Sequence, residues 1–291
     1  MRVISPLPLH FGGPAHFDQP SPTSVRPELV EGRERGASVV RQAHHERKGG
    51  RGKRLALVAT ALSLCAAVVP VCAQAQSTES RLASYRERVE RLEDQDAIEN
   101  LQASYGYYFD KGLWNEVADL FTANGSFEYG QRGVYIGQDR VRRALLLFGP
   151  EGLGQGRLNN HMQLQSIISV APDGKTATAR WQGMVQLAEP GANGVWGVGI
   201  YENEYVKDRG TWKISKLHFY PVALTDYDLG FMRSAMRMEG PSALFPPDKP
   251  PTEVYRTFPS NYIPPFSYVH PVTGQSLKDI KQPADTVVGR P

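Results

Sequence analysis

The sequence predicts an α+β fold in which helices pack on one face of a mostly antiparallel sheet. Between residues 76 and 121, apolar side chains recur at three- and four-residue steps, the period of helices with one buried face. From residue 157 to residue 220, runs that alternate with a period of two are joined by short turns, as in a β-meander. Because helices come first and the long strands follow, the chain lacks the βαβ alternation of a parallel sheet.

Residues 76–93 are expected to form an N-terminal helix, with Ser77 or Thr78 as its cap. Its apolar residues form a narrow stripe that is typical of an oligomer or core seam: Leu82, Tyr85, Val89 and Leu92. Asp96 and Glu99 have capping-box spacing, so the helix can restart there. We expect this second helix to end at Lys111-Gly112, since glycine suits the left-handed position after a helix.

The stretch Tyr105–Phe121 contains the candidate acid, Asp110. Aromatic residues surround it at helical spacing, and a short helix is expected from Leu113 to Phe121. Asp110 is therefore either a solvated residue at a helix end or an acid held beside a pocket.

Shorter elements connect the helices to the meander. We expect strands at 126–129 and 134–136 and a third helix at 138–147, followed by a glycine-rich loop at 148–156. The loop glycines do not follow a strand and open a helix, which argues against phosphate binding. The long strands are expected at 157–171, 176–187, 196–206 and 211–220.

The ends of the chain differ from this middle part. Residues 1–50 lack hydrophobic periodicity and resemble translated intergenic sequence, so we expect them to be disordered and the true translation start to lie downstream. Residues 51–75 have a basic start, an apolar stretch and an Ala73-Gln74-Ala75 cleavage pattern, which predicts a signal peptide and a periplasmic or secreted protein. The alternative is a membrane anchor, for which the stretch is short. Residues 221–291 contain 12 prolines and several aromatic residues, which predicts an extended segment packed on the domain, a neighbouring subunit or the pocket mouth.

Charge and cysteine content exclude several functions. Residues 76–291 carry 23 Lys and Arg against 25 Asp and Glu, so nothing suggests a nucleic-acid surface, or a membrane surface once the signal peptide is removed. Both cysteines, Cys65 and Cys72, precede the cleavage site, so the mature chain has no disulfide or catalytic thiol. Its three histidines, His161, His218 and His270, lack metal-ligand spacing, and we expect neither a metal nor another cofactor.

The order of elements in residues 94–220 resembles the SnoaL-like group of the nuclear transport factor 2-like superfamily, nearest in pattern to scytalone dehydratase. The matching motifs are Phe109-Asp110-Lys111 with Trp114, Glu128-Tyr129, Asn160-His161 and the strand that begins Gly210-Thr211-Trp212. The resemblance implies a curved sheet and helices around a conical pocket, a small hydrophobic ligand, and a homo-oligomer, either a dimer or a trimer.

The resemblance also implies a site. Asp110 would orient the His161 ring, His161 would move a proton, and Tyr129 would donate a hydrogen bond to a carbonyl oxygen. We expect five further residues to contact the substrate: Tyr108, Phe109, Trp114, Phe127 and Tyr201. The chain departs from the family pattern at two places. It has Phe109 where the family has a tyrosine, and Gln186 near the place where the family has a second histidine.

Two functions remain open from the sequence. The first is a cofactor-independent lyase, dehydratase or isomerase acting on an aromatic or cyclic oxygenated compound. The alternative, suggested by the missing second histidine, is a non-catalytic binding or accessory protein with the same pocket. A weaker third possibility is a structural partner that docks through its C-terminal segment.

Overall fold

The computed structural model describes residues 77–283 and 288–289. Its first half contains α1 (Thr78–Asp110), α2 (Trp114–Asp119), β1 (Phe121–Tyr129), β2 (Val134–Ile136), α3 (Gln138–Leu145) and the 3-10 turn η1 (Leu146–Phe148). Four long strands follow: β3 (Leu158–Val170), β4 (Thr176–Glu189), β5 (Asn193–Asp208) and β6 (Thr211–Asp226). Two short strands, β7 (Val254–Tyr255) and β8 (Val288–Gly289), pair with each other.

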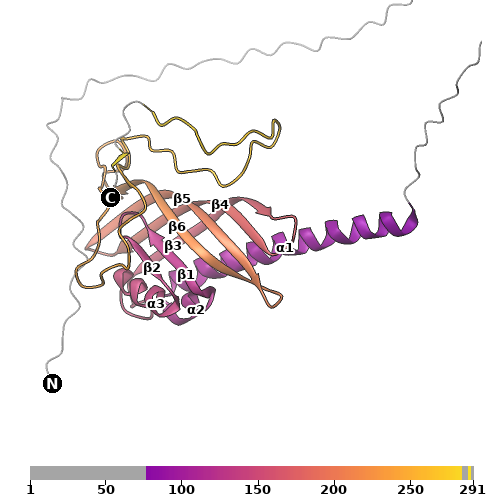
Figure 1. Cartoon of the computed structure of the whole chain (residues 1–291). Helices are drawn as coiled ribbons and strands as arrows, with labels where there is room; N and C mark the ends of the chain where they lie inside the picture. The colour runs from indigo at the N-terminus through magenta and orange to yellow at the C-terminus, as the bar shows by residue number, and fades with distance from the viewer. Residues whose placement is uncertain (1–76, 284–287, 290–291) are drawn as a thin grey trace, which may run out of the picture. The chain divides into compact units, whose positions relative to one another are not determined.

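The main sheet has six strands in the order β2-β1-β6-β5-β4-β3. Neighbouring strands are antiparallel except β1 and β6, which run parallel. The helices lie against one face of the curved, open sheet, while the C-terminal segment lies beside the other face (Figure 1). The expected α+β class and mostly antiparallel sheet are therefore confirmed.

The inner face of the sheet, which faces the helices, carries the hydrophobic core. Side chains alternate between the two faces of the sheet, and those that point inward from β4, β5 and β6 include Trp181, Tyr201 and Phe219. Ile98, Tyr105 and Phe109 pack on them from one side of α1 and are fully buried. Aromatic rings dominate this core, and their large apolar area supplies much of its burial energy.

Helix α1 is one continuous helix of 33 residues, not two. The expected restart at Asp96 is wrong, because the Asp96 carboxylate accepts a 3.0 Å hydrogen bond from Asn100 within the helix instead of capping a new one. Ser77 caps the helix by accepting a 3.1 Å hydrogen bond from the Ser80 amide, as the sequence suggested.

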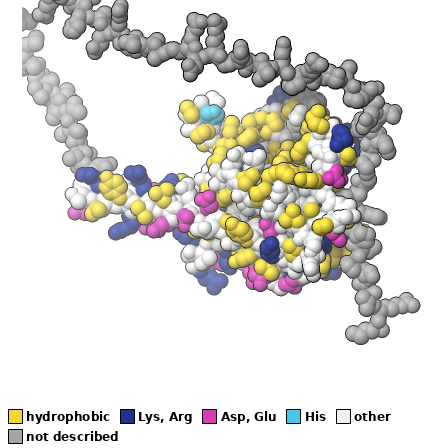
Figure 2. All heavy atoms as spheres, turned by 180° about the vertical axis from the view of Figure 1, so that it is seen from behind, with side chains coloured by type: hydrophobic (Ala, Val, Ile, Leu, Met, Phe, Trp, Pro, Cys, Tyr) yellow, Lys and Arg dark blue, Asp and Glu magenta, His cyan; other side chains and the backbone are white. Residues whose placement is uncertain are grey.

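The N-terminal half of α1 extends beyond the sheet (Figure 1), and charged side chains alternate with hydrophobic ones on its surface (Figure 2). The predicted stripe lies entirely in this half and is exposed: Leu82, Tyr85, Val89 and Leu92. Contact with the sheet begins at Asp94, whose Oδ1 accepts hydrogen bonds from Lys207 Nζ at 2.5 Å and Trp212 Nε1 at 2.8 Å.

A β-bulge divides β3 into two parts. The pairing of β3 with β4 shifts by one residue between Gln163 and Ser166. Before the bulge, His161 faces inward; after it, Ile168 and Val170 pack against the core and Ile167 is exposed. Simple alternation along the strand would place Ile167 on the same face as His161, and the extra residue of the bulge reverses that face.

The outer face of the sheet is covered by the C-terminal segment, residues 227–283. Tyr220 of β6 packs there with Tyr255 and Tyr262, whose rings stack 4.0 Å apart. Backbone hydrogen bonds join the segment to the end of β6, with the Met236 amide donating to Leu224 and the Phe258 amide to Val222. The described residues of this segment therefore pack on the domain of the same chain, which is one of the three places that the sequence left open.

The predicted disordered region, residues 1–50, and the predicted signal peptide, residues 51–75, lie outside the described residues. Among the helices that are described, none combines the length and apolar character needed to cross a membrane.

Candidate functional site

Asp110 is the last residue of α1, and its carboxylate reaches across to β3. The helix ends here because Gly112 adopts a left-handed conformation with φ of +65°. Asp110 Oδ1 accepts a 2.6 Å hydrogen bond from the backbone amide of His161. The acid predicted from its aromatic surroundings is thus fixed to the strand that carries the predicted histidine.

The His161 ring lies next to the same carboxylate. Its Nδ1 is 3.4 Å from Asp110 Oδ1, which is within reach of an ion pair, although no hydrogen bond forms in this geometry. The ring is buried and packs edge-on against Phe109, with the centroids 4.5 Å apart. The structure therefore brings Asp110, Phe109 and His161 together.

Gly106 allows α1 to approach β3 closely enough for these contacts. A Cβ atom at this position would lie 2.9 Å from Gln163 Cγ and 3.3 Å from the carbonyl oxygen of His161. Any larger residue would push the helix away from the strand. The separation of Asp110 and His161 thus depends on a glycine one helical turn before the acid.

Aromatic rings surround the Asp110–His161 pair. Phe109 contacts Trp114 and Phe148, with centroids 5.3 Å and 4.9 Å away. Trp114 donates its indole N–H to the carbonyl of Gly149 at 3.1 Å, and so ties α2 to the glycine-rich loop. The loop is held a second time by the Gly152 amide, which donates to the carbonyl of Gly112 at 2.9 Å.

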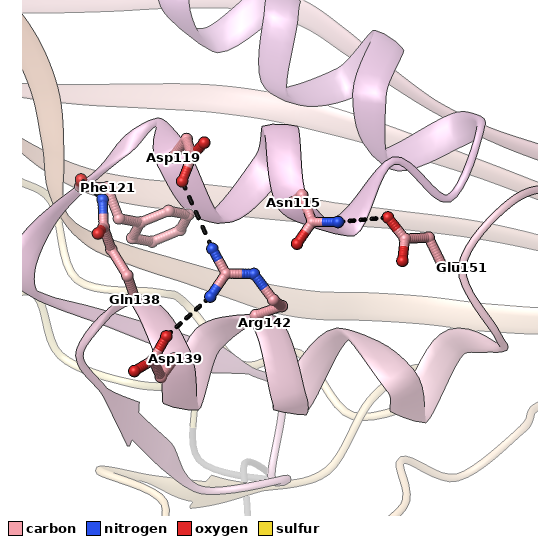
Figure 3. A network of polar contacts seen from close by, with 7 residues as sticks. All are labelled: Asn115, Asp119, Phe121, Gln138, Asp139, Arg142 and Glu151. Carbon is pink, nitrogen blue, oxygen red and sulfur yellow. Dashed lines mark hydrogen bonds and ion pairs between the residues drawn. The ribbon is translucent and has the colours of Figure 1, made fainter.

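Helices α2 and α3 beside this loop are joined by polar contacts (Figure 3). Arg142 of α3 forms ion pairs with Asp119 at 3.4 Å and Asp139 at 2.8 Å. Asn115 of α2 donates a 2.5 Å hydrogen bond to Glu151 of the loop. These surface contacts fix the relative position of the two helices and the loop, and none involves the Asp110–His161 pair.

The structure places the other predicted site residues around the same interior. Tyr129 of β1 contacts Phe148 and Phe219, with centroids 4.8 Å and 4.7 Å away. Tyr201 lies on the inner face of β5, and Phe127 on that of β1. Tyr108 is half-buried and packs against the edge of the core, and its neighbour Tyr107 points to solvent.

Tyr105 and Gln163 also belong to this interior, and sequence reasoning missed both. The Tyr105 hydroxyl is buried and makes no hydrogen bond of regular geometry with the described residues. Gln163 Nε2 donates to the carbonyl of His161 at 2.8 Å and to Tyr201 Oη at 3.4 Å. Tyr105 could have been found from its position one turn before Phe109 on the same helix face. Gln163 could have been found because it lies two residues after His161, on the same face of the strand.

The tyrosine hydroxyls of this interior remain protonated. Burial is the largest cause that raises the pKa of Tyr105, Tyr129 and Tyr201. The negative charge of Asp110 raises the pKa of Tyr105 and Tyr201 further. Three phenols and one carboxylate from α1, β1 and β5 therefore influence one another across the core.

A second carboxylate–histidine pair lies on the outer face of the sheet. Glu128 Oε2 is 3.4 Å from His218 Nδ1, and both residues are buried. Both oxygens of Glu128 accept hydrogen bonds from Thr252 of the C-terminal segment, at 2.7 Å and 2.9 Å. Burial raises the pKa of Glu128 and lowers the pKa of His218 to about 3, so this histidine is neutral.

The two pairs differ in what covers them. The outer pair is sealed by Thr252 and by the Tyr220 ring, which stacks on His218 at 3.7 Å. The C-terminal segment of the same chain therefore covers His218. In residues 77–283, no group of three or more His, Cys, Asp or Glu side chains is arranged to hold a metal ion.

Comparison with known proteins gives a family for the region that contains the inner pair. Residues 90–218 match the model of the SnoaL-like domain, a range that runs from α1 into β6. No match was found among curated protein sequences.

Several solved structures are similar to this chain. One is a protein of unknown function from Mycobacterium tuberculosis, with 23% identity over 45% of this chain and 73% of that chain, and a TM-score of 0.40. Another is a candidate scytalone dehydratase from Novosphingobium aromaticivorans, with 21% identity, 54% and 97% coverage, and a TM-score of 0.42. A protein from the same organism with a cystatin-like fold shows 18% identity, 51% and 92% coverage, and a TM-score of 0.39.

Proposed function

Because residues 90–218 match the model of the SnoaL-like domain, we propose that their inner face acts on a small molecule by acid–base chemistry. The proposed activity is that of a cofactor-independent lyase, dehydratase or isomerase. The substrate class is a small hydrophobic oxygenated compound, aromatic or cyclic, because aromatic side chains dominate the surroundings of the site. The observation that carries the proposal is that the Asp110 carboxylate contacts both the backbone amide and the imidazole Nδ1 of His161.

In this proposal His161 is the group that moves the proton. Asp110 beside Nδ1 would hold a proton on that nitrogen, which leaves Nε2 as the base. Nε2 would remove a proton from the carbon next to a carbonyl group, and the electron pair of that C–H bond would move toward the oxygen. The imidazolium would then return the proton to another carbon in an isomerisation, or to a departing hydroxyl in an elimination.

The separation of 3.4 Å between Asp110 and His161 is longer than an ideal hydrogen bond. Contacts of this kind are commonly long in a site without substrate and shorten when the reacting complex forms. Tyr129 would donate a hydrogen bond to the substrate oxygen, and Phe109, Trp114, Phe127, Tyr108 and Tyr201 would contact its apolar part.

The test is a search for turnover. Purified protein is incubated with a mixture of aromatic and cyclic hydroxyketones, and mass spectrometry follows the loss of water, cleavage of the substrate, and exchange of carbon-bound hydrogen in D₂O. We expect at least one reaction in the wild-type protein, its loss in His161→Gln, and its retention in His270→Gln, a histidine of the C-terminal segment. Equal turnover in His161→Gln would refute the proposal.

A binding or accessory protein is the second candidate function. It is favoured because position 186 holds a glutamine near the place where the family has its second histidine. The Gln186 side chain accepts a 2.9 Å hydrogen bond from Asn160. This candidate predicts that compounds are bound and recovered unchanged, with no hydrogen exchange. A signal peptide and an exported location remain part of the proposal for either function.

A further inference from the structure

Side chains take the place of a neighbouring strand at His161. Among the described strands, β3 pairs only with β4, so the other side of its backbone faces no strand. In an antiparallel strand the N–H and C=O of one residue point to the same side. At His161 both point to this open side, where the N–H donates to Asp110 and the C=O accepts a 2.8 Å hydrogen bond from Gln163 Nε2. The sheet edge is therefore closed here by two side chains.

Gln163 is itself held in one direction by α1. A carbonyl oxygen can only accept, so the Gln163 side chain must turn its NH₂ group toward His161. Its Oε1 then accepts a 2.7 Å hydrogen bond from Nε2 of Gln102. Gln102, Gly106 and Asp110 follow one another at four-residue steps, so they share the face of α1 that lies along β3.

The Gln102 amide is fixed from its other end. Its Oε1 accepts hydrogen bonds from Asn203 Nδ2 at 2.9 Å and from the Tyr205 hydroxyl at 2.8 Å. Asn203 Oδ1 accepts a 3.2 Å hydrogen bond from the backbone amide of His218, and an amide N–H can only donate. Gln102 and Asn203 are fully buried, so a flip of either amide would break hydrogen bonds that water cannot replace. Gln102 therefore always turns its NH₂ group toward Gln163.

These contacts fix both peptide planes that flank the Cα atom of His161. Asp110 holds the preceding plane through the N–H, and Gln163 holds the following plane through the C=O. The two planes together set the direction of the Cα–Cβ bond, and so the place of the imidazole ring. Asp110 Oδ1 lies 3.4 Å from Nδ1 of that ring. Loss of the contact at the carbonyl would therefore let the ring move relative to the carboxylate.

We propose that Gln163 and Gln102 are positioning residues for His161. Gln163 holds the His161 carbonyl, and Gln102 keeps Gln163 in the direction that makes this contact possible. Neither glutamine takes part in the proton transfer. The proposal deepens the proposed function, on which it rests, because it explains how a histidine on an edge strand is held where it can move a proton.

Gln163→Leu tests the contact at the carbonyl. The readout is the NMR signal of the His161 backbone amide, which donates to a carboxylate over 2.6 Å. We expect the variant to shift this signal and to speed its hydrogen exchange about tenfold or more relative to the amide of Phe219 in β6, because a buried carbonyl loses its donor. A purely structural role would speed both amides equally.

Gln102→Glu tests the direction of the network. Burial raises the pKa of such a carboxyl, so it is protonated at about pH 5, where it can donate to Gln163 and accept from Asn203 and Tyr205. The variant should then fold and show the wild-type His161 signal. Once ionised, the new carboxylate offers no donor, and the Gln163 amide turns away from His161. We expect the His161 signal to move toward that of Gln163→Leu as the pH rises, in step with the carbon signal of the new carboxyl.

Gln95→Glu is the matched control. Gln95 makes the same kind of contact from the same helix, because its Nε2 donates to the carbonyl of Ile168 at 3.3 Å, on the other side of the β3 bulge. The same substitution there should leave the His161 amide as it is in the wild type at each pH.

The proposal is overturned if the His161 amide of Gln163→Leu exchanges as in the wild type relative to Phe219. Ionisation of the new carboxyl in Gln102→Glu without a change at His161 would also overturn it. The proposed function fails separately. Absence of turnover together with the expected amide changes would remove the acid–base reaction and leave both glutamines as determinants of the His161 position. Turnover that is lost in His161→Gln but unchanged in Gln163→Leu would keep the reaction and remove the positioning role.

Discussion

Asp110 Oδ1 lies 2.6 Å from the backbone nitrogen of His161 and 3.4 Å from Nδ1 of the same residue. One carboxylate oxygen thus contacts both the backbone nitrogen and the imidazole ring of the histidine. The first contact fixes the end of α1 to β3, and the second sets the environment of the ring. A substitution at position 110 can therefore affect folding and chemistry separately.

We predict that Asp110→Asn and Asp110→Ala separate these two roles. Asparagine keeps an oxygen that can accept from the His161 amide but loses the charge, so turnover should fall about 10²- to 10⁴-fold with little change in stability. Alanine also leaves the buried amide without a partner, which should cost about 1–3 kcal/mol of unfolding free energy. Steady-state kinetics and urea unfolding of both variants check this. Wild-type turnover in Asp110→Asn would contradict the dyad.

The outer pair gives a prediction on acid stability. Burial lowers the pKa of His218 from its ordinary value of 6.5 to about 3, so between these values the unfolded chain binds a proton that the folded chain does not. The stabilising contribution is complete above pH 6.5 and is lost as the pH falls toward 3. Each pH unit in this window should cost up to about 1.4 kcal/mol.

Urea unfolding at a series of pH values from 6.5 to 4 tests this prediction with His218→Gln. The variant should show a flatter loss of stability on acidification. Burial raises the pKa of Glu128, Glu202 and Glu253, so these carboxyls contribute the opposite slope, with stability lost as the pH rises through their folded pKa values. They are present in both proteins, so the difference between the two slopes reports His218 together with its contact to Glu128. Identical slopes would count against a neutral buried histidine.

Glu128 should hold the C-terminal segment on the sheet. It accepts two hydrogen bonds from Thr252, and Glu128→Ala removes both. We expect the segment to detach more often and trypsin to cleave after Arg256 about tenfold faster, since a charged hydrogen bond contributes about 1.5–3 kcal/mol. Mass spectrometry of the digest identifies the cleaved bonds.

The control for that digest is Glu116→Ala, an exposed glutamate on α2. It should leave the cleavage rate unchanged. If Glu128→Ala is digested as slowly as the control, the contacts of Tyr255 and Tyr262 with the sheet hold the segment without Glu128.

The exposed stripe on α1 predicts how copies of the chain associate. Its four residues follow the three- and four-residue spacing of a coiled-coil seam, and the structure leaves them exposed. We expect the wild-type protein to be a dimer or trimer, and Leu82→Glu with Val89→Glu to shift it to monomers. Sedimentation velocity over a range of protein concentrations measures this, with Glu90→Gln as a control off the stripe. An unchanged mass in the double variant would show that the stripe is not the seam.

Much of the fold could be predicted because local patterns decided it. The periodicity of α3 and the turns between β3, β4, β5 and β6 are encoded in neighbouring residues, and all were located within a few residues. The continuity of α1 was missed because the residues around Asp96 fit two patterns equally well. Asp96 can cap a new helix, or it can accept a hydrogen bond from Asn100 inside a continuous one. Only tertiary contact, beginning at Asp94, distinguishes the two.

The candidate site was predictable only in part. Asp110 was predicted from its aromatic surroundings and His161 from a family motif, and the structure places the two side by side, while their roles stay a prediction. Tyr105 and Gln163 were missed because their importance lies in which hydrogen bonds they make or lack, and this depends on the close approach allowed by Gly106. The cover of the outer pair could not be predicted, because Thr252 lies more than a hundred residues from Glu128 in the chain.

The bulge in β3 has a consequence for how this strand can vary in length. His161 and Gln163 face inward on odd-numbered positions, while Ile168 and Val170 face inward on even-numbered ones. Deleting one residue between Gln163 and Ser166 would remove the bulge and give all four residues the same alternation, so the histidine and the apolar residues would still share the inward face. Divergent homologues that keep His161 should therefore tolerate a one-residue deletion at the bulge far better than a one-residue deletion elsewhere between His161 and Val170.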